Sequence, residues 1–385
     1  MKDKLNIAVV TTMQFPSGAA SVNRIMSYSK GIVELGHKVT VLSTNTGSLE
    51  YKIIDGIKYM CMQKPSKNKL IRIFNYIILL PRLIKNISHA KEKFDILILV
   101  SNSLIIIYPI FVLCKIFGIK YILEKSEFPF VLNKKSVFGK LFAKIYVLTT
   151  YKLFDGLIIM TNLLNEYFED KVKYSCKRII IPMTVDVNRF CNVTINNDLG
   201  DYIAYCGDLG GNKDGVKNLI HSFSLIADNY PSLRLLLIGG TKKNEELKEL
   251  EQYTEFLKSR NVCFYGLVNR DRIPSLLSNS KLLALARPSS LQASGGFPTK
   301  LGEYLSAGKP VLVTKVGDIP VYLTDNENAF LVEPDNNFEF AKKISFILDN
   351  YDFALDVAKK GKLLTETIFN YKVQAMRLSD YLHSL

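Results

Sequence analysis

The feature that most constrains the fold is a regular alternation of short β-branched apolar runs with longer segments of helical periodicity. This alternation occurs twice along the 385 residues. The predicted strands are 7–11, 38–42, 57–62, 96–100, 120–123, 156–160 and 178–182 in the first half, and 202–206, 234–238, 262–265, 282–286, 310–314 and 329–331 in the second. Runs such as 96–100 are apolar without interruption, which is typical of strands covered on both faces. The sequence therefore predicts an α/β protein with two doubly wound parallel sheets.

A connector without clear periodicity separates the two halves. Residues 188–201 are rich in Asn, which favours loops over regular structure. We expect a Rossmann-like domain over 1–185 and a second one over 186–365. The last segment, 366–385, has a helical pattern and, by analogy with other two-domain α/β proteins, is expected to pack back on the first domain.

The net charge of +14 lies entirely in the first half of the chain. Residues 1–200 hold 28 Lys and Arg against 14 Asp and Glu, whereas residues 201–385 hold 22 of each. Within the first half, 51–150 carry 17 basic and 5 acidic residues, and the segment 69–85 mixes basic with apolar residues. Such a segment suits an anionic membrane surface, although a core helix with a solvated basic edge explains it equally well. Nucleic acid is disfavoured, because no nucleic-acid-binding motif accompanies the charge.

Targeting and metal signals are weak in this sequence. The apolar run near the N-terminus covers only 5–10, too short for a signal peptide, and no stretch reaches the ~20 apolar residues that span a bilayer. We therefore expect a cytoplasmic protein, peripheral on the inner face of the membrane. The six cysteines form no Cys-x-x-Cys pair, so no metal site is predicted.

Two glycine-rich turns follow predicted strands and open helices. In the first, Gly18 lies just before a helix start, where free N–H groups can meet a phosphate; a tight turn for helix–strand packing is the alternative. In the second, Gly207 is followed by Lys213, whose ammonium can hold a pyrophosphate that the glycine backbone approaches. Lys213 as an ordinary solvated lysine is the alternative there.

A third turn, at 290–303, combines glycine, lysine and glutamate. Gly296 stands at a helix start, with Lys300 and Glu303 within the next turn. A turn of this kind can bind an anion, and the carboxylate can accept hydrogen bonds from ribose hydroxyls. A simple i,i+3 ion pair between Lys300 and Glu303 is the alternative.

Together these motifs resemble the family 4 glycosyltransferases, which are retaining enzymes of the GT-B fold. The resemblance covers nearly the whole chain, and its specific part is the segment 296–311, with its order relative to Gly207 and Lys213. It implies two Rossmann-like domains facing a cleft, with a nucleotide diphosphosugar held mainly by the second and a sugar acceptor by the first. It also implies that no metal or other cofactor is required.

The resemblance assigns roles position by position. Glu303 corresponds to the second glutamate of the family's E-x7-E motif, which holds the ribose, and Lys213 to the pyrophosphate lysine; these two are the predicted catalytic residues. The first glutamate of that motif is replaced by Gly295, and an arginine common after the first glycine is replaced by Asp208. Lys300 and the main-chain N–H groups of 296–299 are expected to take over part of the binding.

The predicted donor-binding residues are Gly18, Gly207, Lys213, Gly239, Val268, Arg287, Gly296, Phe297, Pro298, Thr299, Lys300 and Glu303, and the predicted acceptor-side residues are Arg24, Glu124 and Glu127. The function implied is retaining transfer of a hexosyl group to a saccharide or lipid-linked saccharide in cell-surface polysaccharide synthesis. Two alternatives stay open: a nucleotide-sugar epimerase of the same fold, and a non-catalytic nucleotide-binding GT-B module.

Overall fold

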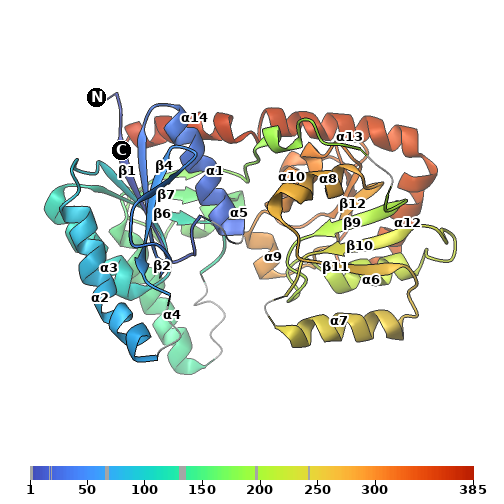
Figure 1. The fold of residues 1–385 in the computed structure, drawn as a ribbon, viewed down its shortest axis with the longest axis horizontal. Coiled ribbons are helices and arrows are strands. Elements are labelled where there is room, and N and C mark those ends of the chain that lie inside the picture. The colour runs from blue at the N-terminus through green and yellow to red at the C-terminus, as the bar shows by residue number, and fades with distance from the viewer. Residues whose placement is uncertain are drawn as a thin grey trace. The chain divides into compact units, whose positions relative to one another are not determined.

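The computed structural model describes residues 3–16, 18, 20–65, 69–129, 136–195, 198–241 and 243–385, with the backbone alone for 69–77. The chain divides into two compact units. The first unit is Met1–Thr184 together with Tyr371–Leu385, and the second is Val185–Asn370. Each unit is an α/β domain built on one sheet (Figure 1).

The first unit contains an eight-stranded sheet in the order β3-β4-β2-β1-β5-β6-β7-β8. The strands are β1 (Asn6–Thr11), β2 (Lys38–Thr46), β3 (Lys52–Ile54), β4 (Ile57–Gln63), β5 (Ile96–Val100), β6 (Lys120–Lys125), β7 (Gly156–Ile159) and β8 (Lys177–Ile180). All neighbours pair in parallel except β3 with β4. Every predicted strand of this half is present, and the doubly wound parallel sheet is confirmed.

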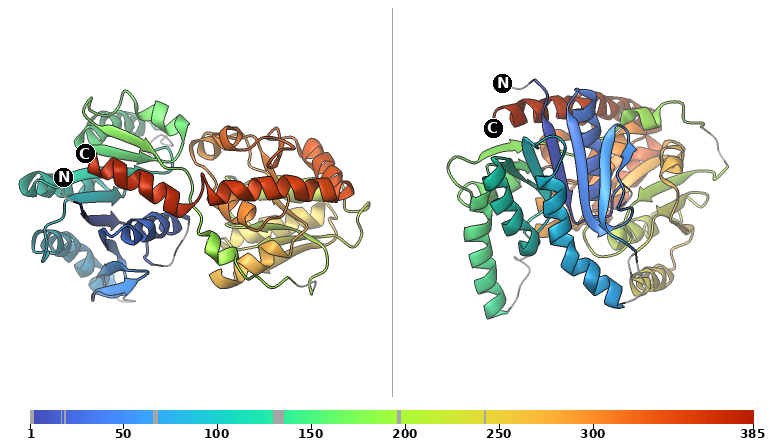
Figure 2. Two further views of the ribbon diagram at one scale, coloured as in Figure 1. Left: turned by 90° about the horizontal axis from the view of Figure 1, so that it is seen from above. Right: turned by 60° about the vertical axis from the view of Figure 1, so that its left-hand side comes forward.

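Helices cover both faces of this sheet. They are α1 (Ala20–Glu34), α2 (Lys69–Ser88), α3 (Leu104–Phe117), α4 (Val137–Thr150), α5 (Asn162–Phe168) and α14 (Tyr371–His383). Alternate residues of the central strands, such as Ile7 and Val9 of β1, pack with α1 and α14 in one core. The helices α2, α3 and α4 lie on the opposite face (Figure 2). The strands are therefore apolar throughout because both of their faces are buried.

The second unit contains a six-stranded parallel sheet in the order β11-β10-β9-β12-β13-β14. Its strands are β9 (Tyr202–Cys206), β10 (Arg234–Ile238), β11 (Val262–Gly266), β12 (Leu282–Leu285), β13 (Val311–Thr314) and β14 (Phe330–Val332). Its helices are α6 (Val216–Ser224), α7 (Asn244–Phe256), α8 (Ile273–Ser278), α9 (Leu291–Gly295), α10 (Lys300–Ser306), α11 (Ile319–Tyr322), α12 (Asn337–Asp349) and α13 (Tyr351–Glu366). The strand order reverses between β9 and β12, and ligands of open α/β sheets bind at the carboxyl ends of strands at such a point.

Two local features differ from the sequence prediction. The strand β3 was missed because it has only three, mostly exposed residues; the turn at Asp55 and Gly56, both with positive φ, joins it to β4 as a hairpin. The final helix is also shorter than 366–385. The chain leaves helical geometry at Thr367, where φ is −114° and ψ is −89°, and α14 begins at Tyr371.

The basic apolar segment 69–85 forms most of α2. In its described part, Leu79 and Leu83 are buried, as is Ile87 beyond it. This part of α2 therefore packs in the core, as the alternative interpretation of the segment held, and the side chains of 69–77 lie outside the described residues. In the part of the chain that the structure describes, no helix is both long enough and apolar enough to cross a membrane.

Candidate active site

The site in the second unit starts where β9 ends. Tyr304 of α10 is fully buried, and its hydroxyl accepts a hydrogen bond from the backbone N–H of Cys206 at 2.7 Å. This bond fixes the first turn of α10 beside the end of β9. Lys300 and Glu303, one turn apart, are thereby held beside the loop 207–215 that leads from β9 into α6.

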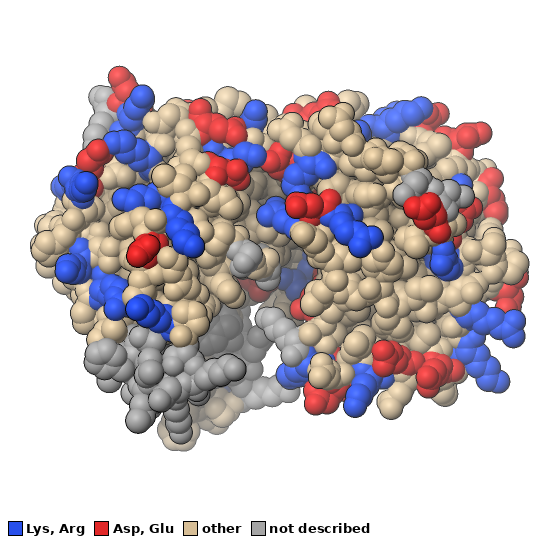
Figure 3. Space-filling view, viewed as in Figure 1, with Lys and Arg blue, Asp and Glu red and all other residues tan. Residues whose placement is uncertain are grey.

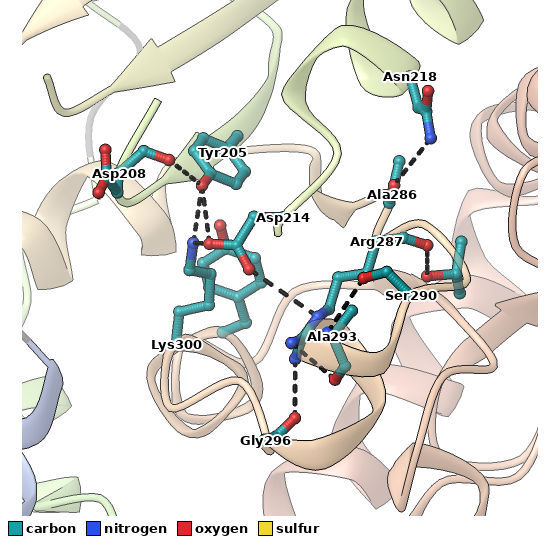
Figure 4. Close-up of polar contacts among 12 residues, drawn as sticks. Tyr205, Asp208, Asp214, Asn218, Ala286, Arg287, Ser290, Ala293, Gly296 and Lys300 are labelled. Atoms are coloured by element: carbon teal, nitrogen blue, oxygen red, sulfur yellow. Dashed lines mark hydrogen bonds and ion pairs between the residues drawn. The ribbon is translucent and has the colours of Figure 1, made fainter. Parts of the chain in front are cut away.

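Lys300 is the centre of a polar network (Figure 4). Its Nζ donates to Asp214 Oδ2 at 2.6 Å and to the Tyr205 hydroxyl at 2.8 Å, and it lies 4.3 Å from the centroid of the Tyr205 ring. Tyr205 in turn donates to the carbonyl oxygen of Asp208 at 2.7 Å. The lysine is thus fixed by one carboxylate and one aromatic ring, at the carboxyl end of β9.

Asp214 keeps this network charged. Burial by itself would raise the pKa of its carboxyl, but the charge and hydrogen bond of Lys300, with the charges of Arg287 and Lys213, outweigh it and hold the pKa below its ordinary value. Lys213, the predicted pyrophosphate lysine, is half-buried next to Asp214. Two lysines and one carboxylate therefore gather at this strand end.

Two glycines of this loop leave no room for a side chain. A Cβ on Gly207 would overlap Lys300 Nζ, and a Cβ on Gly215, which has a φ of +68°, would overlap the carbonyl oxygen of Ala286. Gly239, with a φ of +140°, likewise lies against the carbonyl oxygen of Gly207. These glycines bring the loops after β9, β10 and β12 into direct contact.

Arg287 is buried inside the unit, with a side chain that is 0% exposed. Its guanidinium donates to the carbonyl oxygens of Ala293 at 2.9 Å and Gly296 at 3.2 Å, and its Nε lies 3.9 Å from Asp214 Oδ1 (Figure 4). The side chain is therefore enclosed by its own turn, and its direct contact with the donor stays a prediction. Arg287 holds the turn between α9 and α10 and acts as a positioning residue.

Glu303 is paired with Arg189, which lies in the short helix Val187–Phe190 at the start of the second unit. Arg189 also donates to the carbonyl oxygen of Arg270 at 2.9 Å. In the described part of the chain, Lys300 and Glu303 thus pair with Asp214 and Arg189 rather than with each other. Arg189 was missed in the sequence, because a basic residue in a connector carries no motif.

Burial, followed by the charge of Glu303, raises the pKa of the nearby Cys206 thiol to about 12, so the thiol stays protonated.

The remaining predicted donor residues divide by exposure. Phe297 and Pro298 are buried, and the Phe297 ring packs against Tyr322 and Phe369 at 5.5 and 5.8 Å. Their side chains are therefore part of the core. Binding of the donor by main-chain N–H groups of this turn stays a prediction, from which Pro298 is excluded because proline has no N–H. Gly296 is also buried, whereas Thr299 before α10 and Val268 after β11 are half-buried.

In the first unit, two predicted acceptor-side residues form an internal ion pair. Arg24 Nε lies 2.7 Å from Glu124 Oε1, and the two side chains are 2% and 4% exposed. Arg24 also donates to the carbonyl oxygens of Ile181 and Pro182 at 2.7 and 2.6 Å. This pair ties α1 to the ends of β6 and β8, and its contact with an acceptor stays a prediction.

Other candidates in this unit lie at the carboxyl ends of its strands. Gly18 and Glu127 are exposed, and Ala19 lies outside the described residues. Lys125, which the sequence analysis missed between Glu124 and Glu127, is buried and donates to Asn102 Oδ1 at 2.6 Å. Burial lowers the pKa of this lysine to about 8. Within the described residues, no group of His, Cys, Asp and Glu could hold a metal ion.

Comparison with known proteins agrees with this geometry. Residues 194–364, which contain most of the network, match the family of glycosyl transferases group 1. An uncharacterized glycosyltransferase of Haemophilus influenzae is 24% identical over 153 residues, 40% of this chain and 41% of that protein. The chain therefore spans about two fifths of the length of the curated relatives it matches.

Solved structures match over almost the whole chain. Sucrose-phosphate synthase of Thermosynechococcus elongatus has a TM-score of 0.78 at 16% identity and covers 99% of both chains. HepE of Anabaena, in complex with UDP, has a TM-score of 0.76 at 17% identity and covers 99% of this chain and 100% of that one. The second unit thus matches the glycosyl transferases group 1 family over most of its length, and the chain has the GT-B fold.

Proposed function

We propose that the chain is a retaining glycosyltransferase that moves a hexosyl group from a nucleotide diphosphosugar to a saccharide or lipid-linked saccharide in cell-surface polysaccharide synthesis. The observation that carries the proposal is the clustering of Lys213, Lys300 and Glu303 around the end of β9, within the segment that matches the group 1 family. HepE has been crystallised with UDP and with UDP-glucose, which makes a uridine diphosphosugar the first donor to test.

Each residue has a proposed role in this reaction. The ammonium groups of Lys213 and Lys300 neutralise the leaving diphosphate, the group on which negative charge develops in the transition state. A carboxylate has about four lone-pair sites, so Glu303 can accept from the ribose hydroxyls of the donor while it stays paired with Arg189. The departing phosphate takes the proton of the attacking hydroxyl, as in the family that the sequence resembles.

The departure from the E-x7-E motif has a proposed compensation. Gly295 stands at the first glutamate position and is buried, so no side chain acts from there. Lys300, whose position is fixed by Asp214 and Tyr205, supplies a charge at the same turn instead. We also propose that no metal or cofactor takes part, and that the enzyme works on the cytoplasmic face of the membrane.

The test is turnover of nucleotide sugars by the purified full-length chain. We expect Glu303→Gln and Lys213→Ala each to lower kcat/KM for the donor by about 100-fold or more, because each removes a contact made to the donor in the transition state. Glu251→Gln and Lys248→Ala, both exposed on α7, are the matched controls and should leave kcat/KM unchanged.

The identity of the product separates the alternatives. A transferred sugar with unchanged anomeric configuration supports the proposal. Release of an epimerised free sugar would assign the chain to the epimerases, and nucleotide binding without turnover of any donor would make it a non-catalytic module. Full activity of both the Glu303 and Lys213 variants would overturn the site assignment.

A further inference from the structure

The helix α4 is apolar on the side that faces away from the core. Its exposed side chains include Phe138 (86% exposed), Leu141 (56%), Ile145 (54%) and Leu148 (50%), with Val137 (81%) and Phe142 (43%) beside them. Their spacing of three and four residues places them on one stripe. Ala143, Tyr146, Val147 and Thr150 cover the buried side of the same helix. The helix therefore presents apolar residues both to the core and to its outside.

An ordinary surface helix of this protein looks different. The outer side of α7 carries four exposed glutamates and one exposed lysine, Lys248, and charged side chains are visible along the lower edge of the second unit (Figure 3). Large contiguous apolar patches are rare on soluble proteins and mark interaction sites. The apolar stripe on α4 therefore indicates an interaction site, whereas the charged outer side of α7 is suited to contact with water.

The helix α3 extends the apolar stripe. Its exposed side chains Ile105, Tyr108, Val112 and Ile116 also follow a spacing of three and four residues. The Tyr108 hydroxyl lies 3.2 Å from Thr149 Oγ1 of α4, so the two helices are neighbours. We call the surface formed by Ile105, Tyr108, Val112, Ile116, Val137, Phe138, Leu141, Phe142, Ile145 and Leu148 the α3–α4 face.

The charge around the α3–α4 face has one sign. Neither helix contains an Asp or Glu, and Lys140 and Lys144 are exposed on α4. No acidic residue occurs in the sequence between Glu127 and Asp155. Asp155, at the far end of α4, is paired with Lys173 at 2.6 Å and lies 3.6 Å from Lys115 Nζ. The carboxylate nearest along the chain is thus neutralised by lysines.

We propose that the α3–α4 face binds an anionic lipid bilayer. The aromatic and aliphatic side chains would enter the acyl boundary, and Lys140 and Lys144 would contact the headgroups; an apolar stripe flanked by lysines alone is complementary to such a surface. This inference rests on the proposed function, because a lipid-linked acceptor lies in the bilayer that the first unit would bind. It places the membrane surface on 104–117 and 137–150, rather than on the segment 69–85 that the sequence suggested.

The experiment measures binding of the full-length chain to vesicles of phosphatidylcholine with and without phosphatidylglycerol, by co-sedimentation. We expect binding to the anionic vesicles that weakens with salt. The double variant Phe138→Ser/Leu141→Ser should bind the anionic vesicles at least about tenfold more weakly, because it removes two apolar anchors without adding charge. Lys140→Ala/Lys144→Ala should lower binding to anionic vesicles and reduce its salt dependence.

The matched control is Phe256→Ser/Phe338→Ser, which removes two exposed aromatic side chains from the second unit and should bind like the wild type. Absence of wild-type binding, or equal loss in the control, would overturn the inference. So would a wild-type dimer that Phe138→Ser/Leu141→Ser converts to a monomer, because a second copy would then cover the face. Sugar transfer to a water-soluble acceptor tests the proposed function independently, and the Phe138→Ser/Leu141→Ser variant should retain it.

Discussion

At the scale of single residues, the site depends on the space that glycine leaves. Lys300 reaches Asp214 and Tyr205 only because Gly207 has no side chain, since a Cβ there would overlap the lysine Nζ. A glycine in a turn is usually explained by its backbone conformation. Gly207 does not have a φ in the left-handed region, so its reason is steric. Position 207 has no side chain because the Lys300 side chain occupies the space beside it.

This steric role gives a prediction for Gly207→Ala. The backbone tolerates alanine, so the fold should be retained, while Lys300 Nζ is pushed away from its two partners. Misplacing a charged group by about 1 Å costs about 100-fold in rate, and we expect a loss of this size in kcat/KM for the donor.

A double variant checks the cause. If Gly207→Ala acts through Lys300, then adding Lys300→Ala should cost little more than Lys300→Ala alone, because the two changes remove the same interaction. Losses that multiply in the double variant would contradict this explanation, as would an alanine variant with normal kcat/KM.

At the scale of elements, the C-terminal helix α14 is fixed to the first unit through a histidine. His37 Nδ1 accepts from the backbone N–H of Leu5 at 3.1 Å, and its Nε2 lies 2.8 Å from Ser379 Oγ of α14. The His383 ring of the same helix packs edge-on against the His37 ring, with 5.3 Å between the ring centroids. Burial, followed by the charge of His383, lowers the pKa of His37 below its ordinary value.

The lowered pKa predicts a pH dependence of stability. The folded protein favours neutral His37, so the unfolded chain binds more protons in acid. The stabilising contribution is therefore complete above a pH of about 6.5, the unperturbed value for histidine, and is lost as the pH falls through the lower pKa of the folded state. The urea concentration at the midpoint of unfolding should therefore decrease when the pH is lowered from 7.5 to 5.5.

The variant His37→Asn serves as the control for this effect. Its side-chain oxygen can accept from Leu5 N–H but does not titrate in this range, so the fall between the two pH values should become smaller. An equal fall in wild type and variant would assign the pH dependence to other groups.

At the scale of the whole molecule, the two units differ in charge and in chemistry. The second half of the chain is neutral and holds the Lys300 network, whereas the first half carries the whole excess of +14 and the α3–α4 face. Because a ligand that binds only the folded state stabilises it by mass action, a nucleotide should stabilise the protein through the second unit alone.

Thermal unfolding with UDP, GDP, ADP and CMP checks this prediction. We expect UDP to raise the midpoint, by an amount equivalent to about 2.7 kcal/mol at 100 times its Kd. The shift should shrink in Lys213→Ala and persist in Phe138→Ser/Leu141→Ser. A chain that no nucleotide stabilises would contradict a nucleotide site in the second unit.

The amino-acid sequence alone determined the elements, their order and the loops that carry the site. A buried strand can be predicted from its own residues, because a strand covered on both faces is an uninterrupted apolar run whatever packs against it. The short hairpin strand β3 escaped because its residues are mostly exposed. For the same local reason, the turn at Gly207 and the segment around Glu303 were visible as motifs.

Only the tertiary structure decided which side chains meet. Lys300 pairs with Asp214, Glu303 with Arg189, and Arg24 with Glu124 because the topology brings distant strand ends and loops together. Arg287 similarly has a motif-like position, yet it is buried under its own turn. The outward stripe of α4 also emerged only in three dimensions. A side chain's partner and exposure depend on what packs beside it, and that is a property of the fold rather than of the neighbouring sequence.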